Sequence, residues 1–184
     1  CNNFYVSCER VFSPRLQKKA VVVLSNNDGC IIARSNEAKQ LSIPMGDPFF
    51  KHKEKIKKNN LEVYSSNYSL YADMSNRVMS LLADFCQDIE IYSIDEAFLK
   101  FDLISEKALE EKAYEIRQKI FQFTGIPVSI GLARTKTLAK LANKIAKKNT
   151  GVFLVFGEKK INEILKKTKI EDLWGLSFRS QNKL

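Results

Sequence analysis

The sequence predicts a mixed α+β fold in which helices pack against a sheet. Short apolar segments rich in Val, Ile and Phe alternate with longer segments whose apolar residues recur at helical spacing. Alternation of this kind is typical of a sheet covered by helices. The chain has 184 residues, of which 45% are hydrophobic, enough for one domain or slightly more with a sizeable core.

The first third of the chain predicts short elements. Residues 1–5 are interpreted as the end of a strand. The segment VVVLSNNDGCIIARS (21–35) predicts two short strands joined by an Asn-Asp-Gly turn. NEAKQLSIPMGDP (36–48) predicts a short helix ended by its proline and glycine. KHKEKIKKNN (51–60), with five lysines and one glutamate, is typical of a solvated helix.

The remainder predicts longer helices between strands. Apolar residues recur at helical spacing over 70–85 and 105–124, and Ser105 is a suitable N-cap for the second helix. A strand pair surrounds Asp95. We then expect a strand at VSIGLA (128–133), a helix over 135–148 and a strand at VFLVF (152–156).

Composition limits the classes of function. The formal net charge of +9 favours a polyanionic partner, although a basic surface also serves solubility. No run approaches the roughly 18 apolar residues of a membrane span, and no signal peptide is recognisable, so we expect a soluble, cytoplasmic protein. The four cysteines form no C-x-x-C pair and the only histidine is His52, which argues against a zinc site or a disulfide framework.

The predicted helix over 135–148 carries a row of lysines. Lys136, Lys140, Lys144, Lys147 and Lys148 stack on one side of it, and no acid interrupts the sequence from Arg134 to Lys148. Like charges four residues apart destabilise a helix by a few tenths of a kcal/mol. The row therefore favours phosphates as partners over simple solvation.

An adjacent acid pair, Asp95 and Glu96, interrupts the apolar segment EIYSIDEAFLKF (90–101). Neighbouring residues of a regular strand point to opposite faces, so the two carboxylates can share a ligand only at a turn or bulge. At such a bend they would suit magnesium, which binds one or two carboxylates together with substrate phosphates. The alternative is a pair of exposed turn carboxylates. With the lysine row, the pair indicates phosphoryl or nucleotidyl transfer.

Several motifs resemble one family. YSIDEAF (92–98) closely resembles the palm motif of the Y-family translesion DNA polymerases. Further segments resemble the UmuC-type branch in the same order, and the resemblance extends to about Gly175: NNFYVSCE (2–9), VVVLSNNDGCIIARSNEAK (21–39), IPMGDPFF (43–50), SSNYSLYADMSNRVM (65–79) and GLARTKTLAKLANKIAKK (131–148).

The resemblance implies a role for each matching residue. Asp95 and Glu96 match the carboxylates that hold two Mg²⁺ ions, with Glu96 also as active-site acid. Tyr5 matches the steric gate that excludes a ribose 2′-hydroxyl, and Phe4 would neighbour the triphosphate through its backbone. Lys136 matches a triphosphate ligand.

Other matches are less complete. Lys39 stands where relatives carry an arginine, and lysine keeps the charge but lacks the bidentate fork of arginine. Asn36 stands where other branches have tyrosine. Lys140 and Lys144 are expected to face DNA. The family's first metal-binding aspartate would precede Cys1, which would still offer its backbone carbonyl. WGLS (174–177) replaces the family's WGIG at the start of the thumb.

The family implies a ferredoxin-like palm sheet backed by helices, with a small fingers insertion. We expect the palm over 1–4 and 65–157, the fingers over 5–64 and the start of the thumb over 158–184. The chain would then be a fragment, nearly inactive alone, of an error-prone polymerase of the DNA damage (SOS) response. Its partners would be primer-template DNA, deoxynucleoside triphosphates, a sliding clamp, a UmuD-like accessory protein and the recombinase filament. The alternatives are another palm-fold enzyme, such as a nucleotide cyclase, and a non-catalytic DNA-binding module.

Overall fold

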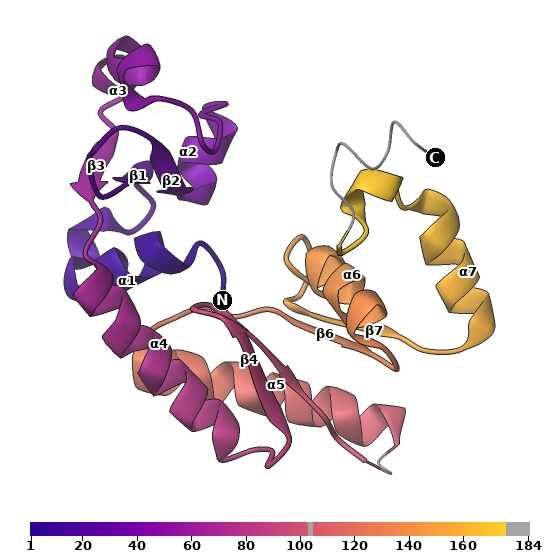
Figure 1. Ribbon diagram of the computed structural model, residues 1–184. Coiled ribbons are helices and arrows are strands. Elements are labelled where there is room, and N and C mark those ends of the chain that lie inside the picture. The colour runs from indigo at the N-terminus through magenta and orange to yellow at the C-terminus, as the bar shows by residue number, and fades with distance from the viewer. Residues whose placement is uncertain (103–104, 176–184) are drawn as a thin grey trace.

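The computed structural model describes residues 1–102 and 105–175 (Figure 1). Three short strands in its first third form a sheet of order β2-β1-β3, in which β1 is central. The elements of this part are α1 (Phe4–Phe12), β1 (Val21–Leu24), β2 (Ile31–Arg34), α2 (Asn36–Gln40), α3 (Lys53–Lys58) and β3 (Glu62–Ser65), with 3-10 turns at Pro14–Leu16 (η1) and Phe49–His52 (η2).

The central strand β1 explains the unbroken apolar run VVVL. It pairs antiparallel with β2, as the Asn-Asp-Gly turn predicts, and parallel with β3. Val21 and Val23 pack into one hydrophobic cluster, whereas Val22 and Leu24 pack into another. A strand covered on both faces has no polar side, so its sequence does not alternate.

The second part contains the longer helices. Its elements are α4 (Tyr68–Ala83), β4 (Ile89–Ser93), β5 (Glu96–Leu99), α5 (Glu106–Thr124), β6 (Ile130–Ala133), α6 (Lys136–Ala146), β7 (Val152–Val155), α7 (Glu158–Lys167) and the 3-10 turn η3 (Ile170–Asp172). The predicted N-cap is confirmed, because the Ser105 hydroxyl accepts a hydrogen bond from the Ala108 backbone N–H. Thr135 caps α6 in the same way.

The strands predicted for one palm sheet lie in two separate pairs. β4 and β5 form an antiparallel hairpin, while β6 and β7, which are connected through α6, pair with each other in parallel. A cleft of about 970 Å³ separates the two pairs, and side chains of α4 and α5, among them Met79, Ile116 and Ile120, line it. The mixed α+β class is confirmed, with small sheets in place of a continuous one.

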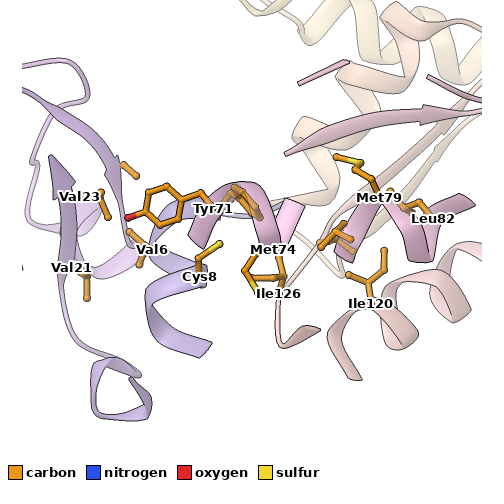
Figure 2. Close-up of a cluster of buried hydrophobic side chains, with 14 of the residues drawn as sticks. Val6, Cys8, Val21, Val23, Tyr71, Met74, Met79, Leu82, Ile120 and Ile126 are labelled. Atoms are coloured by element: carbon orange, nitrogen blue, oxygen red, sulfur yellow. The ribbon is translucent and has the colours of Figure 1, made fainter. Parts of the chain in front are cut away.

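One hydrophobic cluster joins the two parts of the chain. Tyr71 and Met74 of α4 lie between Val21 and Val23 of β1 and the residues at and after the end of α5 (Figure 2). Tyr71 is fully buried, and its hydroxyl donates a 2.7 Å hydrogen bond to Oε1 of Glu9. The β1 sheet is therefore packed onto α4 through shared core contacts.

Some elements differ from those that the sequence predicts. Residues 1–5 do not form a strand: α1 begins at Phe4, immediately after Asn3, whose backbone is left-handed with φ of 46°. Strand β3 and helix α7 were not predicted. The predicted thumb segment ends in residues 176–184, which lie outside the described part, as do two residues of WGLS. Within the described residues, no helix is both long and apolar enough to cross a bilayer.

Candidate active site

The acid pair lies at a bend, as shared ligation by its carboxylates would require. Ser93 pairs with Glu96 across the β4–β5 hairpin, which leaves Ile94 and Asp95 as the two turn residues. The register also shifts between Ile91 and Ser93, so the strand is irregular just before the turn. Asp95 and Glu96 both line the 970 Å³ cleft, as does Cys1.

Hydrogen bonds from three elements fix the turn. The Ser75 hydroxyl of α4 donates to the Ile94 carbonyl at 2.6 Å, and the Ser93 hydroxyl donates to Oδ1 of Asp95 at 2.9 Å. The backbone nitrogen of Cys1 lies 2.5 Å from the Asp95 carbonyl. Ser75 is 7% exposed, so its hydrogen bond is shielded from water. The turn is thus held in place before any ligand binds.

Three of the five lysines in the row, those within α6, are paired with acids, which corrects the premise drawn from the sequence. Lys140 Nζ lies 2.7 Å from Oε1 of Glu96, Lys136 pairs with Glu90, and Lys144 pairs with Asp172. These acids come from β4, β5 and η3, so the sequence of the helix itself could not reveal them. The hydrogen bond from Lys144 also lowers the pKa of Asp172 below its usual value.

The structure separates the roles predicted for these lysines. Lys140, predicted to face DNA, is in contact with the acid pair, whereas Lys136, predicted to bind the triphosphate, pairs with Glu90 and lies 5.4 Å from the centre of the Phe98 ring. Lys140 lies at the same distance from the Tyr92 ring. Lys140 is therefore the better placed of the two to meet a phosphate bound at the carboxylates.

Lys39 approaches the site from α2. Its Nζ donates a 2.6 Å hydrogen bond to Oδ1 of Asn3, and Nδ2 of Asn3 donates to Oδ1 of Asn36 at 3.0 Å. Burial lowers the pKa of Lys39, and the positive charges of Arg34 and Lys147 lower it further. Cations from β2, α2 and the end of α6 are thus close enough to repel one another, which makes the space between them favourable for an anion.

Tyr5 and Phe4 lie at the start of α1, which has no side-chain cap. Tyr5 stacks on Tyr71 with ring centres 4.3 Å apart. Burial raises the pKa of Tyr5, and the charges of Tyr68 and Asp95 add to this shift. The Phe4 side chain, 5% exposed, is part of the core, so only its backbone is available to a ligand.

Metal ligands are few at this site. Across residues 1–102 and 105–175 there is no group of three His, Cys, Asp or Glu side chains that could hold a metal ion. The two carboxylates and the Cys1 carbonyl form a partial set of hard oxygen ligands. Such a set fits Mg²⁺ only if a phosphate and water supply further oxygens, which is the usual arrangement for this ion in nucleotide sites.

Three contributors were missed by sequence reasoning: Asn3, Arg34 and Ser75. Each acts through a partner distant in the sequence, so no local pattern marks it. The positive φ of Asn3 is likewise a property of the fold. The sequence around these residues contains no motif that marks them as functional.

Comparison with known proteins identifies a family that matches most of the chain. A family model described as impB/mucB/samB matches residues 1–144. The chain belongs to the impB/mucB/samB family. It is 47% identical over 188 residues to protein UmuC of Salmonella typhimurium and 30% identical over 191 residues to DNA polymerase IV of Saccharolobus solfataricus.

The match covers this chain but not the whole of its relatives. It includes 100% of the chain and 44% of UmuC, and 98% of the chain and 52% of the S. solfataricus polymerase. A solved structure, the insertion ternary complex of Dbh DNA polymerase, superimposes with a TM-score of 0.86 at 27% identity, covering 98% of this chain and 55% of the other. The chain therefore spans about half the length of these family members.

Proposed function

We propose that this impB/mucB/samB chain is the palm and fingers of a Y-family DNA polymerase that copies damaged templates by two-metal nucleotidyl transfer. The observation that carries the proposal is the acid pair held at the hairpin bend with Lys140 against Glu96. The names of relatives that are DNA polymerases support the same activity.

Asp95, Glu96 and the Cys1 carbonyl would hold Mg²⁺. When bound, such ions neutralise charge on the transferring phosphate and align it with the attacking hydroxyl. The contribution of the chain itself is rigidity, because the hydrogen bonds from Ser75 and Ser93 keep the turn in one geometry. A site formed in advance avoids reorganisation during the reaction.

The triphosphate would bind between the fingers and the palm. Lys39, Arg34 and Lys147 supply positive charge there, and the uncapped N-terminus of α1 adds unpaired backbone N–H groups. Lys140 would exchange part of its contact with Glu96 for a phosphate oxygen. Tyr5, supported from behind by Tyr71, would limit the space beside the sugar and favour deoxynucleotides.

The domain division belongs to the same proposal: palm over 1–4 and 65–157, fingers over 5–64 and the start of the thumb over 158–184. The sliding clamp, the UmuD-like accessory protein and the recombinase filament stay predictions for the longer protein. So does a role in the damage response.

The test is primer extension by the longer protein that contains this chain. We expect Asp95→Asn and Glu96→Gln each to reduce the rate by at least about a hundredfold, since each removes charge at the reacting phosphate. Glu90→Gln is the matched control, because Glu90 lies on the same hairpin and also pairs with a lysine of α6. Normal extension by Glu96→Gln would overturn the proposal.

Two rival functions predict different outcomes. A nucleotide cyclase would form its product from nucleotide alone, without primer or template. A DNA-binding module would bind DNA with a steep salt dependence but incorporate no nucleotide, whichever carboxylate is changed.

A further inference from the structure

The lysine-rich turn and helix at the far end of the fingers form a second charged surface, distinct from the acid pair. We define the fingers basic face as Phe50, Lys51, Lys53, Lys57 and Lys58. All five residues are exposed, and they lie on η2 and α3. In Figure 1, α3 lies at the end of the β1 sheet farthest from α4 and α5. The face therefore lies apart from the proposed catalytic cleft.

The lysines of this face have no acidic partners within the described residues. None of the four lies within 4.0 Å of a carboxylate oxygen, whereas every lysine of α5 and every lysine within α6 does. Glu54 is the only acid of α3, and it forms no ion pair in the described structure. Lys55 is set aside because it donates to the Ser42 carbonyl at 3.5 Å. The lysines of this face, unlike those within α6, are therefore available to bind phosphates.

Phe50 gives the face an apolar component. Its side chain is 67% exposed, immediately before the first lysine of the face. Lys53 Nζ lies 6.0 Å from the centre of the neighbouring Phe49 ring. A surface that serves only solubility needs charge but no exposed aromatic ring. Surfaces that bind single-stranded nucleic acid combine both, because bases stack on rings while cations contact phosphates.

The face is anchored firmly enough to act as a binding surface. Ile56, 7% exposed, fixes α3 to the cluster that contains Val22 and Ile43. His52 lies 3.1 Å from Asp47, and the Phe49 N–H donates to the Gly29 carbonyl at 2.8 Å. The lysines therefore project from a fixed support, so binding would order side chains but not backbone.

We propose that the fingers basic face binds a single-stranded stretch of nucleic acid, with a base stacked on Phe50 and phosphates on the four lysines. Only the identification of this strand as the unpaired template depends on the proposed function. In the proposed function the positive groups around Lys39 serve the nucleotide, so the two surfaces would divide the contacts between them.

Fluorescence anisotropy with a labelled oligothymidylate tests the proposal on the 184-residue chain. Lys57→Ala/Lys58→Ala should weaken binding and reduce the slope of log affinity against log salt by about 1.4, at about 0.7 for each lost phosphate contact. Phe50→Ala should weaken binding at least about fivefold with little change in slope, because stacking releases no counterions.

Matched controls come from α5. Lys107→Ala/Lys119→Ala removes the same formal charge, and Phe123→Ala removes a ring that is 65% exposed. Both should bind as the unaltered chain does. Equal losses in the α5 and α3 variants would overturn the proposal, because only net charge would then matter. The proposal would also be overturned if the α3 variants lost binding to phosphatidylserine vesicles and to oligothymidylate equally. The face would then be a nonspecific anion-binding surface.

The outcome is separable from that of the proposed function. Asp95→Asn and Glu96→Gln should leave oligothymidylate binding at the fingers basic face unchanged while removing primer extension. If the α3 variants bind normally but the carboxylate variants lose extension, this inference fails and the catalytic proposal stands. The reverse pattern would leave a strand-binding face on a protein without the proposed activity.

Discussion

Nζ of Lys140 lies 2.7 Å from Oε1 of Glu96, and the two side chains are 23% and 30% exposed. The second carboxylate of the acid pair is thus already paired with a cation from α6. A divalent ion that binds Glu96 must compete with this ammonium group. In the proposed function, the ammonium group of Lys140 would bind a phosphate oxygen once the ion has bound Glu96.

Replacing Lys140 by glutamine should therefore have two opposite effects in the longer protein. The Mg²⁺ concentration for half-maximal primer extension should fall about two- to fivefold. This factor corresponds to the free energy of a partly exposed ion pair, which the ion would no longer have to break. The KM for the nucleotide should rise about tenfold, because a charged hydrogen bond to phosphate is lost. Lys136→Gln, whose partner is Glu90, should change the Mg²⁺ requirement little. An unchanged Mg²⁺ requirement in Lys140→Gln would contradict competition at Glu96.

Tyr5 should control the choice of sugar. In the proposed function the Tyr5 ring, which stacks on Tyr71 with ring centres 4.3 Å apart, limits the space beside the sugar. Tyr5→Ala would open this space to a 2′-hydroxyl, so ribonucleotide incorporation should rise about 10- to 100-fold relative to deoxynucleotide incorporation. Single-nucleotide incorporation by the longer protein measures this ratio. Tyr68→Ala is the control, because Tyr68 meets Tyr5 edge-on with ring centres 6.1 Å apart. A ratio that changes equally in both variants would argue against a gate at Tyr5.

Gly131 should be essential for the packing of β6 against α6. A Cβ atom at this position would lie 2.2 Å from the Ala139 carbonyl oxygen and 2.2 Å from the Asn143 nitrogen, both of which are backbone atoms. Gly131→Ala should lower the free energy of unfolding by about 1–3 kcal/mol or more, measured by urea denaturation. Gly29→Ala is a milder control, because its Cβ would meet only the Asn27 side chain, at 3.1 Å. Equal stability of the two variants would be inconsistent with the close β6–α6 contact.

Cys8 should make stability fall at alkaline pH. Burial raises the pKa of its thiol from 9.0 to about 12, and the charge of Glu9 adds to the shift. Between these values the unfolded chain loses this proton while the folded chain keeps it. The stability due to the group is therefore complete below pH 9 and is lost as pH rises towards 12, by up to about 1.4 kcal/mol for each pH unit.

Urea denaturation of the unaltered chain and of Cys8→Ala, compared from neutral pH to above pH 9, isolates this contribution. Ionisable groups that do not interact with Cys8 affect both proteins alike, whereas the charge of Cys8 contributes to the raised pKa of Tyr71 and is therefore part of the measured difference. The difference in unfolding free energy should shrink as the pH rises. Parallel curves would show that Cys8 titrates at the same pH in the folded and unfolded chain.

The sequence predicts most of the helices and strands but not how they combine. The hairpin of β1 and β2, the cap Ser105 and the strand pair around Asp95 follow from local patterns. Helix α1 was missed because its first residues were interpreted as the end of a strand. Asn3 is a residue type common at N-caps, but its backbone is left-handed and its side chain makes no capping hydrogen bond. The separation of β4–β5 from β6–β7 depends on tertiary packing, which no local pattern encodes.

The carboxylates of the candidate site were predictable, whereas the pairing of its lysines with acids was not. Asp95 and Glu96 stand out because acids are rare inside apolar strands. The partners of Lys136, Lys140 and Lys144 lie on other elements, so the row looks uncompensated when only its helix is considered. The approach of Lys39 to Lys147 is equally invisible, since it joins α2 to the end of α6.

The shared core around Tyr71 limits how the protein could select nucleotides. Swinging the β1 sheet away from α4 would return Tyr71, Val21 and Val23 to water, at roughly 1.5–3 kcal/mol for each side chain. A hinge between these parts is therefore costly, so under the proposed function a gap wide enough for a distorted base would have to be open before the nucleotide binds. Discrimination against wrong partners would then fall to fixed shape and charge, with no closing step to check them.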